Sequence, residues 1–499
     1  MTTDGSTSPI SAGYLSSPAA TTAGPAQLRL PAETMRTLGY RAVDIVVEHL
    51  TRLGSEPVAR RLSRADLGPV LDEELPLHAE DPMAVLERAH QLLRSGNAHC
   101  DDPRFLAFIP SPGNYLATIA AMLAAGFNVP TSGWFVGPTA TAIELTTIRW
   151  LVELLDLPAR TSGLFVPGGS TANLLGLAVA RDTRLGHDTT NAVAYYSDQT
   201  HFTVDRALHT LGLRPEQSRR MPSDHYLRLQ PARLAEQITE DRADGLRPFL
   251  VVANAGTTDT GAVDPLPELA ALCRREDLWL HVDGAYGAVA RITDPGKQIL
   301  AGLELADSVA VDPHKWLFQP AEMGCILLRE PDLLRHTFGV RRPSYISAAG
   351  HHDGIDLMQY GIQQTREFRA LRLWMSLKTF GSDAFRQAVA RGMELATSME
   401  RFITAHPNLE LVTPSSLATL TFTCKPNPGR EHPQAIEDLL DQISTRLLDD
   451  GNALITPTTV AGRHVLRMCT INPRSNLDDL KAITDHISHL ALQTETTKR

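Results

Sequence analysis

The feature that most constrains the fold is an alternation of short apolar runs with helical stretches between about residues 160 and 320. Helices are expected at Thr171–Arg181 and Leu266–Glu276, among others. Such alternation makes a mostly parallel sheet with helices on both faces, and its ligand site lies at the carboxyl ends of the strands. The predicted strands are Gly163–Val166, Ala192–Tyr196, Phe249–Ala253, Leu278–Val282 and Ser308–Val311.

The segments around this sheet divide the chain of 499 residues further. Helices that begin near Pro31 and Met83 carry apolar stripes, which predicts packing against a second copy of the chain. A long helix is expected from about Thr365 to Phe380. The four predicted parts are a disordered tail (1–29), an N-terminal helical dimerisation segment (30–110), a large α/β domain (111–385) and a small C-terminal α/β domain (386–499).

Composition excludes several classes of protein. The net charge is -10 and no basic block occurs, which argues against a nucleic-acid partner. The longest apolar stretch, Tyr115–Phe127, is shorter than the roughly 18 residues of a membrane span, and no Lys or Arg precedes Arg29, so we expect a cytoplasmic protein without a leader. The five cysteines lack any CxxC spacing, which disfavours disulfides and a zinc site and predicts buried thiols and no metal.

A glycine-rich turn follows the first predicted strand. Gly168-Gly169-Ser170-Thr171 comes after the strand that ends at Val166, and it opens a helix. The free N–H groups and the positive end of such a helix bind phosphate. No Gly-Lys-Ser/Thr follows, which disfavours nucleoside triphosphates. Taken alone, the turn fits a plain helix cap equally well, with Ser170 or Thr171 as the capping side chain.

Two further polar residues follow predicted strands and therefore face the same edge of the sheet. Asp283 follows Val282 in the string HVDGAY, and taken alone it fits an N-cap of the next helix. Lys315 follows the strand that ends at Val311, in the string DPHKW. Its apolar neighbours favour a nucleophilic amine, although most lysines are solvated surface groups.

Together these three features match the chemistry of pyridoxal 5'-phosphate. The glycine-rich turn would hold the phosphate, Lys315 would bind the cofactor covalently, and Asp283 would keep the pyridine nitrogen protonated, so that the ring accepts electrons. The strings GTT (256–258) and DQTH (198–201) also follow predicted strands and can complete the pocket. The joint interpretation is favoured over separate helix caps.

Five strings of the sequence carry a resemblance to a known family. They are SDQTHFTVDRA, NAGTTDTGAVDPL, LWLHVDGAYGA, DPHKW and REFRALRLW. Through them the chain resembles the group II pyridoxal-phosphate-dependent decarboxylases, in particular the aromatic L-amino acid decarboxylases, from about Leu38 to nearly its C-terminus. The resemblance implies the fold of the fold-type I pyridoxal-phosphate-dependent transferases, with a mostly parallel seven-stranded sheet, and a homodimer in which the N-terminal helices wrap the partner.

The resemblance also implies a role for each site residue. Lys315 would carry the cofactor, Asp283 would pair with the pyridine nitrogen, and His201 would stack on the ring. Tyr345 matches a tyrosine of a mobile loop that is implicated in protonating the substrate carbon after carbon dioxide leaves. The implied catalytic residues are Lys315, Tyr345, His201 and Asp283, and the implied cofactor-binding residues are Gly169, Ser170, His201, Thr258, Asp283, Ala285, His314 and Lys315.

Departures from the family pattern bear mainly on the substrate, expected to be an amino acid. Ile109 stands where an aromatic residue is common, and the segment around Ser132 lacks the bulky residues of aromatic-specific members. Asp312 replaces the usual asparagine before Pro-His-Lys. An aromatic amino acid is expected by resemblance, with a branched aliphatic or other apolar one as the alternative. The residues expected to contact the substrate are Phe108, Ile109, Pro110, Ser111, Ser132 and Trp134.

The expected reaction is decarboxylation of an L-amino acid to the corresponding amine. Oxidative formation of an aldehyde on the same scaffold is an alternative, against which Tyr345 and His201 argue, because aldehyde-forming relatives often substitute one of these positions. A protein that binds pyridoxal phosphate without catalysis is a third hypothesis. The presence of Lys315, Asp283, His201 and Tyr345 argues against it.

Overall fold

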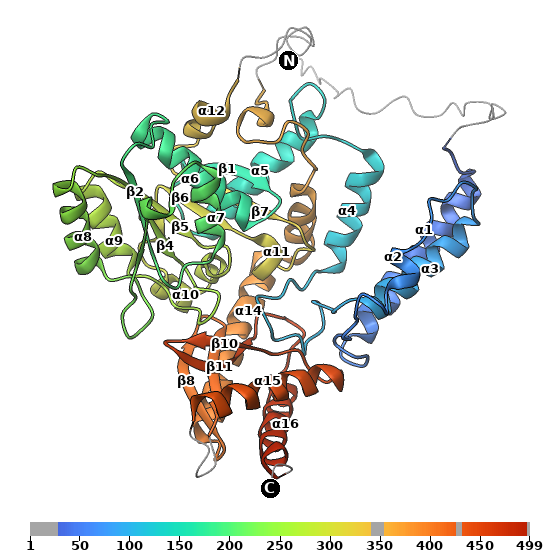
Figure 1. Ribbon diagram of the computed structural model, residues 1–499. Coiled ribbons are helices and arrows are strands. Elements are labelled where there is room, and N and C mark those ends of the chain that lie inside the picture. Colours follow the sequence, from blue (N-terminus) through green and yellow to red (C-terminus); the bar gives the residue numbers. More distant parts are fainter. Residues whose placement is uncertain (1–27, 341–353, 426–431, 497–499) are drawn as a thin grey trace, which may run out of the picture.

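The computed structural model describes residues 28–340, 354–425 and 432–496. A seven-stranded sheet in the order β1-β7-β6-β5-β4-β2-β3 forms its centre (Figure 1). Five strands pair in parallel, in the spatial order β6-β5-β4-β2-β3. Strand β7 runs antiparallel to both of its neighbours, β1 and β6. This confirms the mostly parallel sheet, although the sequence pattern missed β3 and β7. The strands are β1 (Ser162–Val166), β2 (Ala192–Ser197), β3 (Ser218–Met221), β4 (Arg247–Asn254), β5 (Trp279–Asp283), β6 (Ser308–Val311) and β7 (Gly324–Leu328).

Helices cover both faces of this sheet because its strands are apolar on both sides. In β4, Leu250 and Val252 pack on one face, and Val251 and Ala253 pack on the other. Unbroken apolar runs are typical of strands buried on both faces. The first face is covered by α6 (Gly169–Leu185), α7 (Thr203–Thr210) and α12 (Asp332–Phe338), and the second by α5 (Pro138–Leu154), α8 (Pro231–Ala243), α9 (Leu266–Arg275) and the first part of α14 (Ala370–Ala405).

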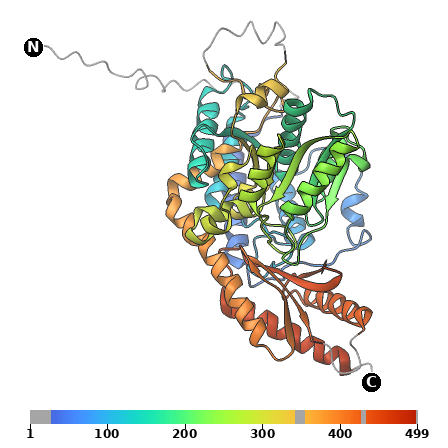
Figure 2. The same ribbon diagram turned by 90° about the vertical axis from the view of Figure 1, so that its left-hand side faces the viewer.

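Helix α14 joins the large domain to a smaller C-terminal unit, which lies at one end of the molecule (Figure 2). Gly381 interrupts the helix with a φ of 74°, a left-handed conformation that glycine adopts readily. The predicted boundary at residue 386 falls inside α14. The predicted domain limits stay a prediction. The C-terminal unit contains a four-stranded antiparallel sheet of order β10-β11-β9-β8. Its elements are β8 (Leu409–Ser416), β9 (Thr419–Cys424), α15 (Pro433–Asp449), β10 (Thr456–Val460), β11 (Arg463–Cys469) and α16 (Leu477–Thr496).

The N-terminal helices α1 and α3 lie to one side of the sheet (Figure 1). An ion pair between Arg41 and Glu87 joins them, and neither helix has a buried residue. Helix α4 is strongly apolar, yet Met122, Leu123 and Phe127 on it are exposed. These apolar faces are left uncovered by the described part of a single chain. The helices are α1 (Ala32–Arg52), α2 (Gly68–Leu71), α3 (Pro82–Gly96) and α4 (Tyr115–Phe127).

One prediction about the cysteines is wrong. Four of the five are buried, but Cys100 is exposed, because it lies in the irregular connection after α3 and not in a strand or helix of the core. Within residues 28–340, 354–425 and 432–496, no helix is both long and apolar enough to cross a membrane.

Candidate active site

A cavity of about 500 Å³ opens at the carboxyl ends of the parallel strands. Segments that follow β1, β2, β4, β5 and β6 line it, so the topology gathers residues that lie far apart in the sequence. Its lining includes all eight residues predicted to bind the cofactor: Gly169, Ser170, His201, Thr258, Asp283, Ala285, His314 and Lys315. The positions follow from the strand-end argument, and the roles stay predictions.

The glycine-rich turn lines this cavity at the start of α6. Helix α6 begins at Gly169, and no side chain caps it. The N–H groups of Thr171 and Ala172 bind the carbonyl of Gly168. The alternative of a plain cap by Ser170 or Thr171 is therefore wrong, and the uncapped helix start is suited to an anion.

Glycine at position 169 lets two other segments approach the turn. A Cβ at this position would lie 2.8 Å from Asp312 Oδ2 and 2.9 Å from the Cβ of Ala285. Both distances are shorter than a carbon atom tolerates. The close approach of the helix start to the segments after β5 and β6 thus depends on the missing side chain.

Lys315 lies in the short helix α11 (Pro313–Trp316), directly after β6. Its ammonium nitrogen lies 3.2 Å from Asp312 Oδ2, and its side chain is 22% exposed. The apolar neighbours Trp316 and Leu317 are buried in the core. The amine therefore has a carboxylate partner, which the apolar sequence context did not predict.

Asp283 is the last residue of β5 and accepts two hydrogen bonds. Asn173 Nδ2 donates to Oδ2 at 2.9 Å, and the N–H of Ala285 donates to Oδ1 at 3.2 Å. Neither donor is charged, so the negative charge of the carboxylate remains available to a cation in the cavity. Asn173 belongs to α6, so this bond joins the helix that follows the glycine-rich turn to the strand that carries Asp283.

A chain of buried hydrogen bonds continues behind Asn173, away from the cavity. Asn173 Oδ1 lies 2.9 Å from His281 Nε2. Ser308 Oγ lies 2.7 Å from His281 Nδ1 and accepts a bond of 2.8 Å from Trp279 Nε1. An amide oxygen only accepts, so Nε2 carries the proton and Nδ1 accepts from the Ser308 hydroxyl. Burial lowers the pKa of His281 to about 4, which keeps the ring neutral.

Sequence reasoning missed both Asn173 and His281. The available signal for His281 was its spacing of two residues from Asp283 on one strand, which places both side chains on the same face. Asn173 carried no comparable signal, because it lies in the second turn of a helix among apolar residues.

His201 follows β2 and lies beside the same cavity. Its Nδ1 lies 2.8 Å from Thr203 Oγ1, and its ring centre lies 4.3 Å from that of Phe202. Burial lowers the pKa of His201 despite the opposing attraction of the Asp283 carboxylate. The imidazole is therefore neutral near pH 7, a state suited to stacking on an aromatic ring.

His314 also lines the cavity, on the side of Lys315. Its Nδ1 lies 2.9 Å from the carbonyl oxygen of Met323. Burial lowers the pKa of His314, against the attraction of the nearby Asp312 carboxylate. This imidazole therefore adds hydrogen-bonding capacity to the cavity but little positive charge near pH 7.

The six residues predicted to contact the substrate are absent from the described lining of the cavity. Ile109, Pro110 and Ser111 follow Phe108, which is 59% exposed. The Phe108 carbonyl accepts a bond of 2.5 Å from Arg467, whose guanidinium also donates to the Thr258 carbonyl at 2.6 Å. This arginine connects the segment of Phe108 to the cavity wall.

Ser132 and Trp134 contact the chain just after residues 341–353. The Ser132 carbonyl accepts from the N–H of Met358 at 2.8 Å, and the N–H of Trp134 donates to Asp356 at 2.9 Å. Tyr345 lies outside the described residues. The substrate contacts and the role of Tyr345 therefore stay predictions.

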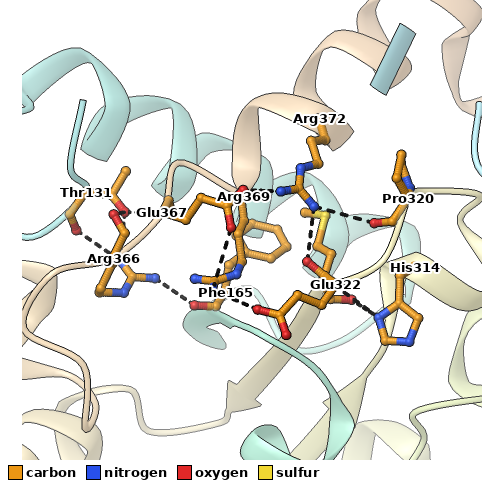
Figure 3. A network of polar contacts seen from close by, with 10 residues as sticks. Thr131, Phe165, His314, Pro320, Glu322, Arg366, Glu367, Arg369 and Arg372 are labelled. Atoms are coloured by element: carbon orange, nitrogen blue, oxygen red, sulfur yellow. Dashed lines mark hydrogen bonds and ion pairs between the residues drawn. The ribbon is translucent and has the colours of Figure 1, made fainter. Parts of the chain in front are cut away.

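A buried ion pair supports the strand that leads into the glycine-rich turn, and Figure 3 shows its arginine, Arg366, beside Phe165. Arg366 and Glu144 are 2.6 Å apart, and both side chains are almost completely buried. Arg366 also donates to the carbonyl of Phe165, near the end of β1, at 2.7 Å. Losing one partner of such a pair leaves an uncompensated buried charge, so this contact strongly restricts the path of β1.

Arg366 belongs to the string REFRALRLW, and two further arginines of this string contact the loop after α11 (Figure 3). Arg369 lies 3.2 Å from the Glu322 carboxylate, and Arg372 donates to the Glu322 carbonyl at 3.1 Å. Glu322 lines the cavity. Side chains of the string REFRALRLW thus contact a residue of the cavity lining, a role that the sequence alone did not indicate.

Comparison with known proteins agrees with this geometry. Residues 65–425 match the pyridoxal-dependent decarboxylase conserved domain. An aromatic-L-amino-acid decarboxylase of Bacillus atrophaeus is 44% identical over 470 residues, which cover 93% of this chain and 97% of the relative. A phenylacetaldehyde synthase of Arabidopsis thaliana is 30% identical over 458 residues, which cover 89% of this chain and 92% of the relative.

The fold has a similar solved structure. The crystal structure of Oryza sativa TDC with PLP and tryptamine superposes with a TM-score of 0.89 at 26% identity, covering 95% of this chain and all of that one. The sequence matches, the similar solved structure and the residues of the cavity therefore indicate the same family. The chain belongs to the pyridoxal-dependent decarboxylase family, and its cofactor is pyridoxal 5'-phosphate.

Proposed function

We propose that this protein decarboxylates an aromatic L-amino acid to the corresponding amine and carbon dioxide. One observation carries the proposal: an uncapped helix start, the Asp283 carboxylate and the Lys315 amine converge on one cavity. The identity of 44% to an aromatic-L-amino-acid decarboxylase supports the substrate class.

The residues around the cavity fit pyridoxal phosphate. The N–H groups at the start of α6 suit a phosphate, and a Cβ on Gly169 would close the turn against Asp312. Asp283, held by neutral donors, suits a protonated pyridine nitrogen. Lys315 supplies the amine that an aldehyde requires. Three different groups of one molecule thus find partners of matching chemistry.

Different residues of the chain have different proposed roles in the reaction. Pyridoxal phosphate, when bound, supplies an electron sink for the electron pair that carbon dioxide leaves behind. Asp283 holds a proton on the ring nitrogen and so keeps this sink effective. Lys315 would hold the cofactor through its amine. His201 and Ala285 line the same cavity and would contact the two faces of the ring.

A survey of substrates tests the proposal. The full-length protein with pyridoxal phosphate is incubated with each common L-amino acid, and amines, aldehydes and peroxide are measured by mass spectrometry and a peroxide assay. We expect amine from Phe, Tyr or Trp, and none from the Lys315→Ala variant. Amine only from branched aliphatic substrates would establish the alternative substrate, and aldehyde with peroxide would establish the oxidative alternative. No product from any substrate would contradict the proposal.

We also propose that the protein works as a homodimer in the cytoplasm. The support for the dimer is the apolar surface of α1, α3 and α4, where large side chains such as Tyr40, Leu93 and Phe127 are exposed in the single chain. A second copy that covers these faces would bury them, as the apolar stripes of the N-terminal helices predict.

A further inference from the structure

Asp312 is a buried carboxylate at the end of the cavity where the phosphate is proposed to bind. Its side chain is 3% exposed. Oδ2 lies 3.2 Å from the Lys315 amine and 3.7 Å from His314 Nε2, while Oδ1 is buried without a hydrogen-bond partner. His314 contributes little charge, because burial lowers its pKa. Lys315 is therefore the one cation paired with this carboxylate among the described residues.

The carboxylate also lies against the glycine-rich turn. A Cβ on Gly169 would lie 2.8 Å from Oδ2, and a Cβ on Gly324 would lie 2.9 Å from Oδ1. Two glycines thus make the room in which the carboxylate lies beside the start of α6. The positive end of a helix attracts any anion placed there, whether a phosphate or a side chain of the protein.

We propose that Asp312 is an internal competitor of the cofactor phosphate, which weakens the binding of pyridoxal phosphate by placing a negative charge beside the positive helix end and by pairing with Lys315. A phosphate bound at the turn would lie close to this carboxylate, which contacts Gly169, and like charges at short distances repel strongly in a buried site. Asparagine has the same shape without the charge. The inference rests on the proposed position of the phosphate at the turn.

The test compares two ligands that differ only in the phosphate. Pyridoxine 5'-phosphate and pyridoxine share a ring and lack the aldehyde, so neither reacts with Lys315. Their dissociation constants are measured by calorimetry on the full-length protein after removal of the cofactor. We expect Asp312→Asn to tighten the binding of pyridoxine 5'-phosphate by about tenfold or more and to leave pyridoxine nearly unchanged.

A matched control and a second measurement complete the test. Asp283→Asn removes a carboxylate from the ring end of the cavity, so it should change the binding of both ligands by a similar factor. On the loaded enzyme, pyridoxal phosphate should leave Asp312→Asn about tenfold more slowly after dilution than it leaves the wild type. If Asp312→Asn does not fold, as judged by circular dichroism, Asp312→Ser is measured in its place.

The outcomes separate this inference from the proposed function. If phosphate adds no affinity in either the wild type or the variant, the turn is not the phosphate site, and both proposals lose their basis. If phosphate adds affinity but Asp312→Asn leaves that gain unchanged or reduces it, the carboxylate is no competitor, and the proposed function stands.

Discussion

The side-chain amide of Asn173 donates a hydrogen bond of 2.9 Å to Oδ2 of Asp283. Asn173 receives its own orientation from His281, which donates to the amide oxygen from a ring fixed in one tautomer. The carboxylate that faces the cavity is therefore held by a chain of neutral, buried groups. We infer that Asn173 is a positioning residue for Asp283.

The Asn173→Ala variant tests this relationship. We expect turnover to fall by about 10- to 100-fold, as is usual when a partner that orients an active group is removed. The midpoint of the cofactor absorbance change with pH should also shift, which a purely structural defect would not cause. Asn476→Ala serves as the control, because Asn476 caps α16 far from the cavity and should affect stability but not absorbance.

The Lys315→Ala variant tests covalent attachment of the cofactor. The side chain is partly exposed in the cavity and pairs only with Asp312 in the described structure, so the fold should persist. We expect borohydride treatment to add the mass of the reduced cofactor to the wild type and nothing to the variant. Decarboxylation by the variant above a trace would contradict the role of this lysine.

The buried His281 predicts how stability depends on pH. Burial lowers its pKa to about 4 in the folded state, from about 6.5 when the chain is unfolded. The unfolded chain therefore binds a proton first as the pH falls, and the free energy of unfolding decreases between pH 6.5 and 4. Between pH 7 and 5 this group alone should cost about 2 kcal/mol.

Another buried group titrates in the same range with the opposite sign. Burial raises the pKa of Asp264 to about 6, so the folded state gains stability from its protonation as the pH falls below 6. Comparing the wild type with His281→Gln cancels this contribution, because Asp264 is present in both. Urea unfolding at pH 7 and pH 5 should show the smaller pH dependence in the variant. Equal dependences would mean that His281 is protonated without penalty in the folded protein.

Truncation of the N-terminus tests the proposed dimer. Removal of residues 1–26 should leave a protein of twice 54.5 kDa, less the two tails, with full activity. Removal through Leu53 takes away α1 and should cost both the dimer and activity. Light scattering coupled to size exclusion measures the mass. A fully active monomer would contradict the prediction.

The variant Tyr345→Phe tests the proposed proton donor, which lies outside the described residues. Loss of the hydroxyl should leave cofactor binding intact and slow the release of amine, because the α-carbon lacks its general acid. Reaction with oxygen should then yield aldehyde, ammonia and peroxide. Amine release at the wild-type rate without peroxide would exclude this role.

Residues at strand ends were the part of the site that the sequence could predict. Lys315, Asp283 and His201 each follow an apolar run, and parallel strands bring such positions to one edge. Their partners could not be predicted in this way. Asn173 reaches Asp283 from a helix that begins more than a hundred residues earlier, and only the packing of α6 on β5 brings the two together.

The missed strands have physical reasons as well. β3, with the sequence SRRM, lies at the edge of the sheet, where polar side chains are tolerated and the apolar signal is weak. β7 runs against its neighbours, so the alternation of strand and helix gave no reason to expect it. The exposed position of Cys100 likewise depends on the path of a loop, which no apolar pattern describes.

The place of β1 in the sheet has a consequence for synthesis on the ribosome. β1 is an edge strand whose neighbour in the sheet is β7, the last of the seven to be translated. A nascent chain can therefore pair β2 to β6 while β1 and the turn after it still lack their place in the sheet. The part of the cavity lined by the glycine-rich turn is completed only when β7 emerges, so we expect cofactor loading at the end of translation of the large domain.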